Sequence, residues 1–164
     1  MIITVKNKDT LIFDDFVFKC CVGKNGLTNS KIEGDKKTPK GLFKLDKLYL
    51  RNDRLNIPKT KLKVIYIKKN MGWCNDVRSK KFYNKPIKIN NYVRYEKLYR
   101  HDYKYNLFIP IKYNWENTKI GRGSAIFLHL TRSYKPTAGC IGLNEKDFLI
   151  LIKLIDKKTK LKII

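Results

Sequence analysis

The chain has 164 residues, a length that suits one domain and leaves no room for a second of ordinary size. Hydrophobic residues make up 43% of the sequence and aromatic residues 12%. This composition excludes a disordered or collagen-like polypeptide, because it supplies enough apolar surface for a packed core. We therefore expect a single domain over residues 1–164.

The charge of the chain is strongly unbalanced. Lys and Arg number 37 against 14 Asp and Glu, which gives a formal net charge of +23. Such a charge favours an anionic partner, such as nucleic acid, anionic lipid or an acidic polymer. However, Lys is spread evenly along the chain and far outnumbers Arg, whose forked guanidinium is preferred for specific phosphate readout. The even spread favours background composition, and we expect no specific nucleic-acid partner.

Cysteine spacing and apolar runs exclude further classes of protein. Cys20, Cys21, Cys74 and Cys140 show neither CxxC spacing nor paired histidines, so we expect no metal site and no disulfide framework. The first residues lack the apolar run of a secretory signal, and no segment approaches the roughly 20 apolar residues of a membrane span. The sequence therefore predicts a soluble chain and gives no export signal from which to infer its location.

Short apolar runs open the chain. Residues 2–5 and 16–22 are separated by turn chemistry, which predicts a β-hairpin or meander. The neighbouring Cys20 and Cys21 would point to opposite faces of the second strand, as small buried hydrophobes. Residues 23–41 then form a loop rich in Gly, Asn, Lys and Thr. A loop of this length inside a compact domain is uncommon and is typical of a functional segment.

Further strands are predicted over residues 42–45, 62–68, 106–113 and 124–130. The third of these contains Pro110, which indicates an edge strand or a bulge because proline donates no hydrogen bond to a ladder. The last is the most apolar strand candidate in the chain.

One amphipathic helix is predicted after Leu143. Asn144 can cap it, Asp147 lies in its first turn, and a broad apolar face follows. Residues 161–164 can add a last strand. The predicted fold class is therefore mostly β, with one clear helix near the C-terminus.

Cys140 and His129 are candidates for nucleophilic catalysis. His129 lies near the end of the most apolar strand candidate, and Cys140 follows Gly139 after a short loop. An imidazole within reach can take the proton of a thiol, and a glycine lets a substrate carbonyl approach the backbone N–H groups of an oxyanion hole. By spacing alone, a buried cysteine and a structural histidine remain the more common explanation.

Two segments carry a resemblance to a known family. Residues 123–129 (GSAIFLH) and 136–143 (PTAGCIGL) resemble the active-site signature of L,D-transpeptidase catalytic domains (YkuD-like), in which a strand-borne His precedes a loop and Ser/Thr-x-Gly-Cys. Upstream pieces over residues 23–26, 31–35 and 38–41 follow in the family's order. The resemblance covers essentially the whole chain and indicates a compact single-domain subgroup.

This resemblance implies a fold and a reaction. The fold would be an L,D-transpeptidase-like β-sandwich. The reaction would be acyl transfer on peptidoglycan stem peptides through a thioester on Cys140, with His129 as base and N–H groups near Gly139 and Cys140 as the oxyanion hole. The resemblance implies no cofactor and no metal. Its substrate implies the periplasm or the cell wall, and we expect a monomer.

The chain departs from the family pattern at two positions. Ala138 stands where many members have a histidine, so only His129 can be the base. Gly142 stands two residues after the nucleophile, where an arginine often provides a contact for the substrate carboxylate. The second departure leaves the recognition of the substrate unexplained.

Residues on both sides of the signature are candidates for substrate contacts, although each has a structural alternative. For Trp73 a core position is at least as common as a place in a groove. Glu33 in the long loop can bind its own backbone. The candidates are Arg122, Ser124, Thr137, Ala138, Trp73, Asn75, Asp76 and Tyr83.

Two alternative functions stay open. A cysteine L,D-carboxypeptidase or endopeptidase would use the same residues, with water in place of the acceptor amine. A basic nucleic-acid-binding module with a structural cysteine is more distant. Tyrosines between residues 92 and 105 could stack on bases, but no known nucleic-acid-binding fingerprint is present.

Overall fold

The computed structural model describes residues 1–164 and consists mainly of strands, with one helix. The predicted class, mostly β with a single helix near the C-terminus, is confirmed. The strands are β1 Ile2–Lys6, β2 Thr10–Phe13, β3 Phe16–Cys21, β4 Leu27–Thr28, β5 Thr38–Pro39, β6 Gly41–Lys44, β7 Leu48–Leu50, β8 Val64–Tyr66, β9 Met71–Cys74, β10 Pro86–Lys88, β11 Tyr95–Lys97, β12 Leu107–Pro110, β13 Phe127–Leu130, β14 Ile141–Leu143 and β15 Lys160–Ile163; the helix is α1 Glu145–Leu154.

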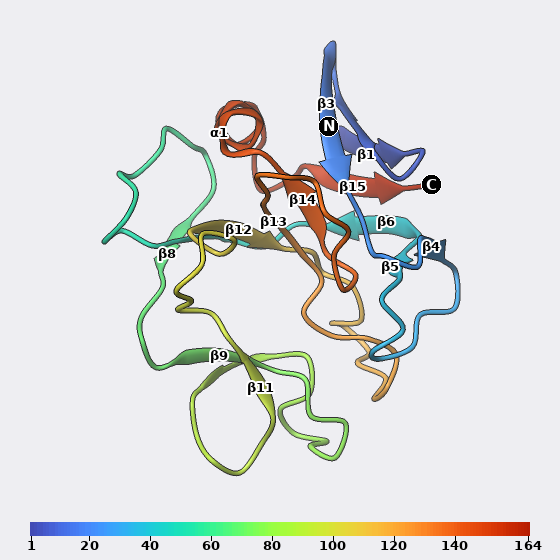
Figure 1. Cartoon of the computed structure of the whole chain (residues 1–164), viewed down its shortest axis with the longest axis vertical. Coiled ribbons are helices and arrows are strands. Elements are labelled where there is room, and N and C mark those ends of the chain that lie inside the picture. Colours follow the sequence, from blue (N-terminus) through green and yellow to red (C-terminus); the bar gives the residue numbers. More distant parts are fainter.

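Ten strands form one large curled sheet in the order β6-β15-β1-β2-β3-β14-β13-β12-β7-β8. Figure 1 shows this sheet in the upper part of the molecule together with α1 and both termini. A three-stranded antiparallel sheet, β10-β9-β11, lies apart from it at the lower end of the view. Its strands have only three or four residues each and are flanked by polar residues. They are therefore too short to show an apolar pattern, and the sequence analysis did not predict them.

The N-terminal strands form the predicted meander. β1, β2 and β3 pair antiparallel in chain order, and β15 adds to β1 in parallel. Cys20 and Cys21 are both buried, as expected for small hydrophobes on opposite faces. The four residues of β2 were missed because they lie within the segment that the sequence assigned to turns.

Of the two alternatives predicted for Pro110, the edge strand is wrong. β12 is not an edge strand, because it lies between β7 and β13. Proline is tolerated there because Pro110 is the last residue of β12, whereas β7 pairs only with Leu107 and Phe108. No ladder partner on that side needs the N–H that proline lacks.

The helix agrees with its sequence signals. The Asn144 side chain accepts a hydrogen bond of 2.9 Å from the N–H of Asp147, which caps the first turn. Phe148, Leu151 and Ile152 are buried against the sheet. Each fully buried side chain of this kind contributes roughly 1.5–3 kcal/mol of transfer free energy, which holds α1 in place. No helix in the structure has the length and apolar character to span a membrane.

A second, smaller hydrophobic core lies between the two sheets and packs against both. Trp73 of β9 packs edge-on against Phe127 of β13 with ring centroids 5.0 Å apart, and Phe108 stacks on Phe127 at 4.8 Å. Cys140 belongs to this cluster. The aromatic core therefore fixes the small sheet against the strand that precedes His129.

Candidate active site

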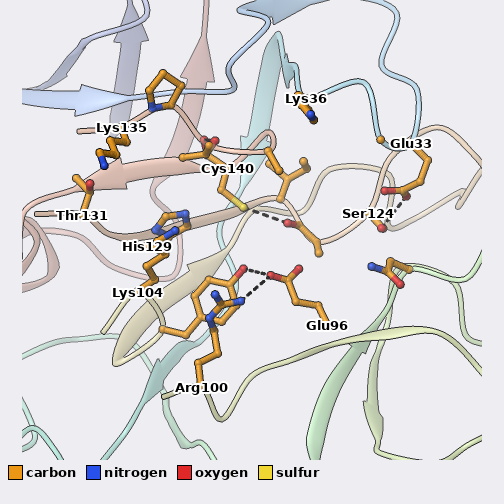
Figure 2. Close-up of a pocket in the computed structure, with 18 of the residues that line it drawn as sticks. Glu33, Lys36, Glu96, Arg100, Lys104, Ser124, His129, Thr131, Lys135 and Cys140 are labelled. Carbon is orange, nitrogen blue, oxygen red and sulfur yellow. Dashed lines mark hydrogen bonds and ion pairs between the residues drawn. The ribbon is translucent and has the colours of Figure 1, made fainter. Parts of the chain in front are cut away.

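His129 and Cys140 lie on neighbouring strands. β13 and β14 pair in parallel, with His129 opposite Gly142, and Cys140 is the residue just before β14. Both side chains line one cavity of about 610 Å³, and Figure 2 shows the imidazole and the thiol turned into it. The strand pairing therefore brings together two residues that are separated by a loop in the sequence.

The Cys140 thiol is held in its neutral form. Sγ donates to the carbonyl oxygen of Ala125 at 3.2 Å and accepts from the N–H of Phe127 at 3.3 Å. Burial, together with the smaller effect of the nearby Glu96 carboxylate, raises the pKa of the thiol to about 12. The structure thus contains a thiol and not a preformed thiolate.

His129 is also neutral, and its hydrogen bond sets its tautomer. Nδ1 lies 2.8 Å from the carbonyl oxygen of Leu130. Because a carbonyl only accepts, Nδ1 carries the hydrogen and Nε2 keeps a free lone pair. Burial lowers the pKa of the imidazole to about 4. A neutral imidazole with a free nitrogen is the form that can take a proton.

The turn before Cys140 depends on glycine. Gly139 has φ +139°, and a Cβ there would lie 2.9 Å from the carbonyl oxygen of Lys37. Thr38 Oγ1 donates to the carbonyl of Gly139 at 2.8 Å, which ties the long N-terminal loop to this turn. The N–H of Gly139 itself donates to Thr137 Oγ1 at 3.0 Å.

This arrangement corrects one expectation about the oxyanion hole. The N–H of Gly139 is occupied by Thr137 and is not free to bind an oxyanion. The N–H of Cys140 makes no hydrogen bond within the chain. Gly139 therefore contributes its backbone conformation, and Cys140 supplies the available donor.

Residues 123–125 form the opposite edge of the cavity and have an unusual backbone. Ala125 has φ +51°, a conformation that costs a residue with a Cβ about 1–2 kcal/mol. Its N–H donates to Asn84 Oδ1 at 3.1 Å, and the N–H of Gly123 donates to the Tyr83 hydroxyl at 3.0 Å. These bonds offset the strain and hold the carbonyl that accepts the Cys140 thiol.

Glu33 completes this edge from the long N-terminal loop. Its carboxylate accepts from Ser124 Oγ at 2.7 Å and from the Tyr83 hydroxyl at 2.5 Å. The loop was expected to be functional, and Glu33, Lys36 and Gly34 line the cavity. We call Glu33, Tyr83 and Asn84 the clamp, because together they hold residues 123–125.

The other side of the cavity is mostly basic. Arg100 lies between the carboxylates of Asp102, at 2.5 Å, and Glu96, at 3.7 Å. Glu96 also accepts a hydrogen bond from the Tyr105 hydroxyl, and burial raises its pKa. Lys104 and Lys135 line the same side and make no ion pair within the chain. No group of three or more His, Cys, Asp and Glu side chains is placed to hold a metal ion.

The structure divides the predicted contact residues into two groups. Four line the cavity: Ser124, Thr137, Ala138 and Asn75. Asn75 lines the cavity, but its carboxamide oxygen is buried and accepts no hydrogen bond within the chain.

The other four predicted contact residues do not line the cavity. Trp73 is fully buried, and its Nε1 donates to Asn84. Asp76 is buried and accepts from the side chain and N–H of Arg78. Tyr83 is buried in the clamp, and the exposed Arg122 lines a separate hollow. The polar atoms of Trp73, Asp76 and Tyr83 are used in hydrogen bonds within the chain, so these three residues have a structural role around the site.

Sequence reasoning did not assign Glu96, Lys104 and Lys135 to the site. Each is a common charged residue in a chain rich in charge, and the family resemblance gave none of them a role. Lys104 gave no signal in the sequence. Its backbone carbonyl accepts from the N–H of Leu130, which follows His129 in β13, and only the structure reveals this proximity.

Comparison with known proteins agrees with the geometry. The family model of the L,D-transpeptidase catalytic domain (YkuD) matches residues 2–163. The chain therefore belongs to the L,D-transpeptidase catalytic-domain family, as its resemblance indicated. No relative was found among the curated proteins.

Solved structures show the same fold. The cell shape determining protein Pgp2 from Campylobacter jejuni is 20% identical, with a TM-score of 0.53, and the match covers 99% of this chain and 46% of Pgp2. Bd1075 from Bdellovibrio bacteriovorus is 17% identical, with a TM-score of 0.51, and the match covers 99% of this chain and 47% of Bd1075. The chain thus spans less than half the length of these neighbours.

Proposed function

We propose that the protein is a peptidoglycan-modifying enzyme that transfers acyl groups of stem peptides through a thioester on Cys140. The observation that carries this proposal is the placement of a free His129 Nε2 and the Cys140 thiol in one cavity. Membership of the L,D-transpeptidase family supports the same substrate class.

Acylation begins with the neutral pair. The S–H of Cys140 turns from the Ala125 carbonyl toward His129 Nε2, which takes the proton as sulfur attacks the carbonyl carbon of the scissile amide. The oxyanion formed accepts a hydrogen bond from the N–H of Cys140. When the tetrahedral intermediate collapses, the C–N bond breaks and His129 returns the proton to the leaving amine.

The second half-reaction regenerates the thiol. An amine of a second stem peptide gives its proton to His129 and attacks the thioester carbonyl. The C–S bond then breaks, and the proton passes from His129 to the sulfur. No oxidant or reductant takes part, because one amide bond is exchanged for another.

Asn75 and Ser124 are substrate-binding residues in this proposal. Asn75 lines the cavity, and its carboxamide can hydrogen-bond the peptide backbone of the acyl part of the stem. Ser124 lines the cavity on the same side but donates to Glu33, so it presents its remaining acceptor capacity to the substrate.

Hydrolysis of the same thioester is the second candidate function. The loop that covers the cavity is exposed at Ser133, Lys135, Pro136 and Ala138. Water can therefore reach the thioester as readily as an amine, and the protein would then act as an L,D-carboxypeptidase. The first half-reaction is the same for both candidates.

The test uses a carbapenem as an acylating probe and mass spectrometry of the intact protein. We expect one adduct per chain in the wild type and none in Cys140→Ala. Cys20→Ala is the matched control, because Cys20 is buried in the meander away from the cavity, and it should be labelled as the wild type is. Labelling of Cys140→Ala at another cysteine with the same stoichiometry would refute the assignment.

A further inference from the structure

Five strands at one end of the large sheet have a face that no other element covers. They are neighbours in the order β6-β15-β1-β2-β3, and Figure 1 shows β1, β3, β15 and β6 away from the small sheet at the lower end of the view. Along these strands, every second side chain packs in or against the main hydrophobic core, and the alternate side chains are exposed or half-buried. We call the side that carries these alternate side chains the open face.

Strand register makes the open face one continuous surface. Lys162 of β15 lies opposite both Leu42 and Thr4. Ile12 of β2 lies opposite both Thr4 and Val17. Residues directly opposite each other point to the same side of a sheet and are close enough for their side chains to touch. One row of side chains therefore crosses all five strands.

The charge on the open face has one sign. It carries no Asp or Glu and five lysines: Lys6, Lys19, Lys44, Lys160 and Lys162. Among them only Lys44 has a carboxylate within ion-pair distance, that of Glu116 at 3.3 Å. Neighbouring aspartates lie in the turns before and after β2. The open face therefore presents four unpaired ammonium groups to a partner.

Aliphatic side chains are exposed on the same face. Val17 is 70% exposed, Leu42 51% and Ile2 48%, and Ile12 is half-buried between them. Aliphatic groups beside ammonium groups on flexible stems fit the surface of an anionic bilayer, because the former enter the acyl boundary while the latter stay at the phosphates. Nucleic acid would offer phosphates to the lysines but no apolar environment for the aliphatic groups.

The open face continues into the side of the sheet that carries the active site. Gly142 of β14 pairs with both Cys21 of β3 and His129 of β13, so the Cys21 and His129 side chains point to one side of the sheet. Lys19 follows Cys21 on that side, and its ammonium lies 4.9 Å from the ring centroid of Tyr134 in the loop that covers the cavity. The catalytic cavity therefore lies at the border of the open face.

We infer that the open face binds the surface of an anionic phospholipid bilayer, with its lysines at the lipid phosphates and its aliphatic side chains between the headgroups. Binding in this way holds the catalytic cavity beside the membrane. None of the lysine and aliphatic side chains of the open face lines the cavity, so the cavity stays accessible in the bound protein. The inference goes beyond the proposed function and does not depend on the acyl chemistry.

The test measures co-sedimentation of the full chain with vesicles of phosphatidylcholine, alone or mixed with an equal part of phosphatidylglycerol. The charge variant is Lys160→Gln/Lys162→Gln. Its matched control is Lys88→Gln/Lys97→Gln, which removes the same charge from exposed positions on β10 and β11. Thermal unfolding of each variant should match the wild type, because all four side chains are exposed.

A second pair of variants tests the aliphatic groups. Val17→Asp places a carboxylate on the open face, and Val77→Asp is the control, because Val77 is exposed in the small-sheet region outside the open face. Carbapenem labelling of all variants reports on the active site separately, so failure of the proposed function and failure of the docking surface are distinguishable.

We expect the wild type to bind the mixed vesicles about tenfold or more tightly than phosphatidylcholine alone, and added salt to weaken this binding. A lysine near an anionic membrane strengthens binding by roughly fivefold, so the charge variant should bind the mixed vesicles about tenfold or more weakly than its control. Val17→Asp should likewise bind more weakly than Val77→Asp.

Three results would overturn the inference. Failure of the wild type to bind the mixed vesicles would exclude a membrane surface as the partner. Equal losses in Lys160→Gln/Lys162→Gln and Lys88→Gln/Lys97→Gln would show that net charge alone attracts the protein. Binding to peptidoglycan sacculi or duplex DNA that is tighter than to vesicles, and that only the charge variant loses, would assign the open face to an acidic polymer instead.

Discussion

The two edges of the cavity are built in different ways. Cys140 and His129 lie at or beside regular strands, β14 and β13, and their polar atoms contact only neighbouring backbone. The opposite edge, residues 123–125, has left-handed backbone at Ala125 and is held by side chains from distant parts of the chain. The first edge carries reactive groups, whereas the second positions them.

Because the two edges are built differently, substitutions in them should have different effects on stability and activity. Removing a reactive group beside a strand leaves the ladder and the core intact, so chemistry is lost and stability is kept. Removing a clamp residue leaves buried N–H groups without partners and lets the strained backbone at residues 123–125 relax. The free energy of unfolding and the rate of acylation should therefore decrease together. The free energy of unfolding and the rate of acylation, measured in the same variants, distinguish the two edges.

The largest effect is expected at the base. His129→Gln should lower the rate of carbapenem acylation by about 10²–10⁴, because no other imidazole lines the cavity. Thermal unfolding should change little, since Gln retains a polar group near the Leu130 carbonyl. His101→Gln is the control and should stay within a few-fold, because His101 is exposed outside the cavity. Equal losses at both histidines would mean that His101 belongs to the site.

The clamp is most vulnerable at Asn84. Its buried side chain accepts from Trp73 Nε1 and the Ala125 N–H, and donates to the carbonyls of Tyr113 and Asn114. It also has φ +56°, which asparagine tolerates better than alanine. Asn84→Ala should lower the free energy of unfolding by roughly 2–4 kcal/mol and slow acylation as well.

Urea denaturation and the adduct assay measure the two effects at Asn84. Asn117→Ala is a matched control, since Asn117 is exposed and its side chain makes no hydrogen bond within the chain, and stability should change by less than about 0.5 kcal/mol. A stable Asn84→Ala protein with slow acylation would show that the clamp positions the thiol without supporting the fold.

The low pKa of His129 predicts a specific pH dependence of stability. Burial lowers the pKa in the folded protein to about 4, so between about pH 6.5 and 4 the unfolded chain binds the extra proton. His129 therefore makes stability fall as pH falls through this window, by up to about 3 kcal/mol. The difference in unfolding free energy between wild type and His129→Gln should change over this range and be constant above it. A difference that does not depend on pH would contradict the buried neutral imidazole.

The smallest effect is expected at Glu33. Glu33→Gln keeps an acceptor for Ser124 and Tyr83 but removes the charge, so stability should fall by about 1 kcal/mol and acylation by less than tenfold. Urea denaturation and the adduct assay again separate the two quantities. A loss of acylation as large as that of His129→Gln would show that Glu33 acts in the chemistry and not in the clamp.

The reactive edge could be predicted because its residues are rare and lie in two segments that resemble the L,D-transpeptidase signature, whereas spacing alone favoured a buried cysteine and a structural histidine. The chain has two histidines and four cysteines, and only His129 and Cys140 fall within an apolar strand candidate and a glycine-bearing turn. The same reasoning identified the helix, whose cap and apolar face are local signals. The strands β13 and β14 then place both residues at one cavity.

The clamp and the basic side could not be predicted because their signals are not local. Asn84 and Ala125 are 41 residues apart, and their contact depends on a small sheet whose strands are too short to show periodicity. An aromatic residue beside Gly72 fits a groove or a core position equally well, and only packing against Phe127 shows that Trp73 lies in the core. Lysines such as Lys104 are too common in this chain to stand out.

Product analysis with a peptide donor and acceptor decides whether acyl groups pass through Cys140. A tetrapeptide stem is incubated with the wild type or Cys140→Ala and with an excess of an acceptor stem, and the products are identified by chromatography and mass spectrometry. The account predicts that the wild type releases the terminal D-amino acid and forms both cross-linked dimer and hydrolysed tripeptide, because the covering loop leaves the thioester open to water. Cys140→Ala should form none of these products. Absence of release by the wild type, or equal release by Cys140→Ala, would contradict acyl transfer through Cys140.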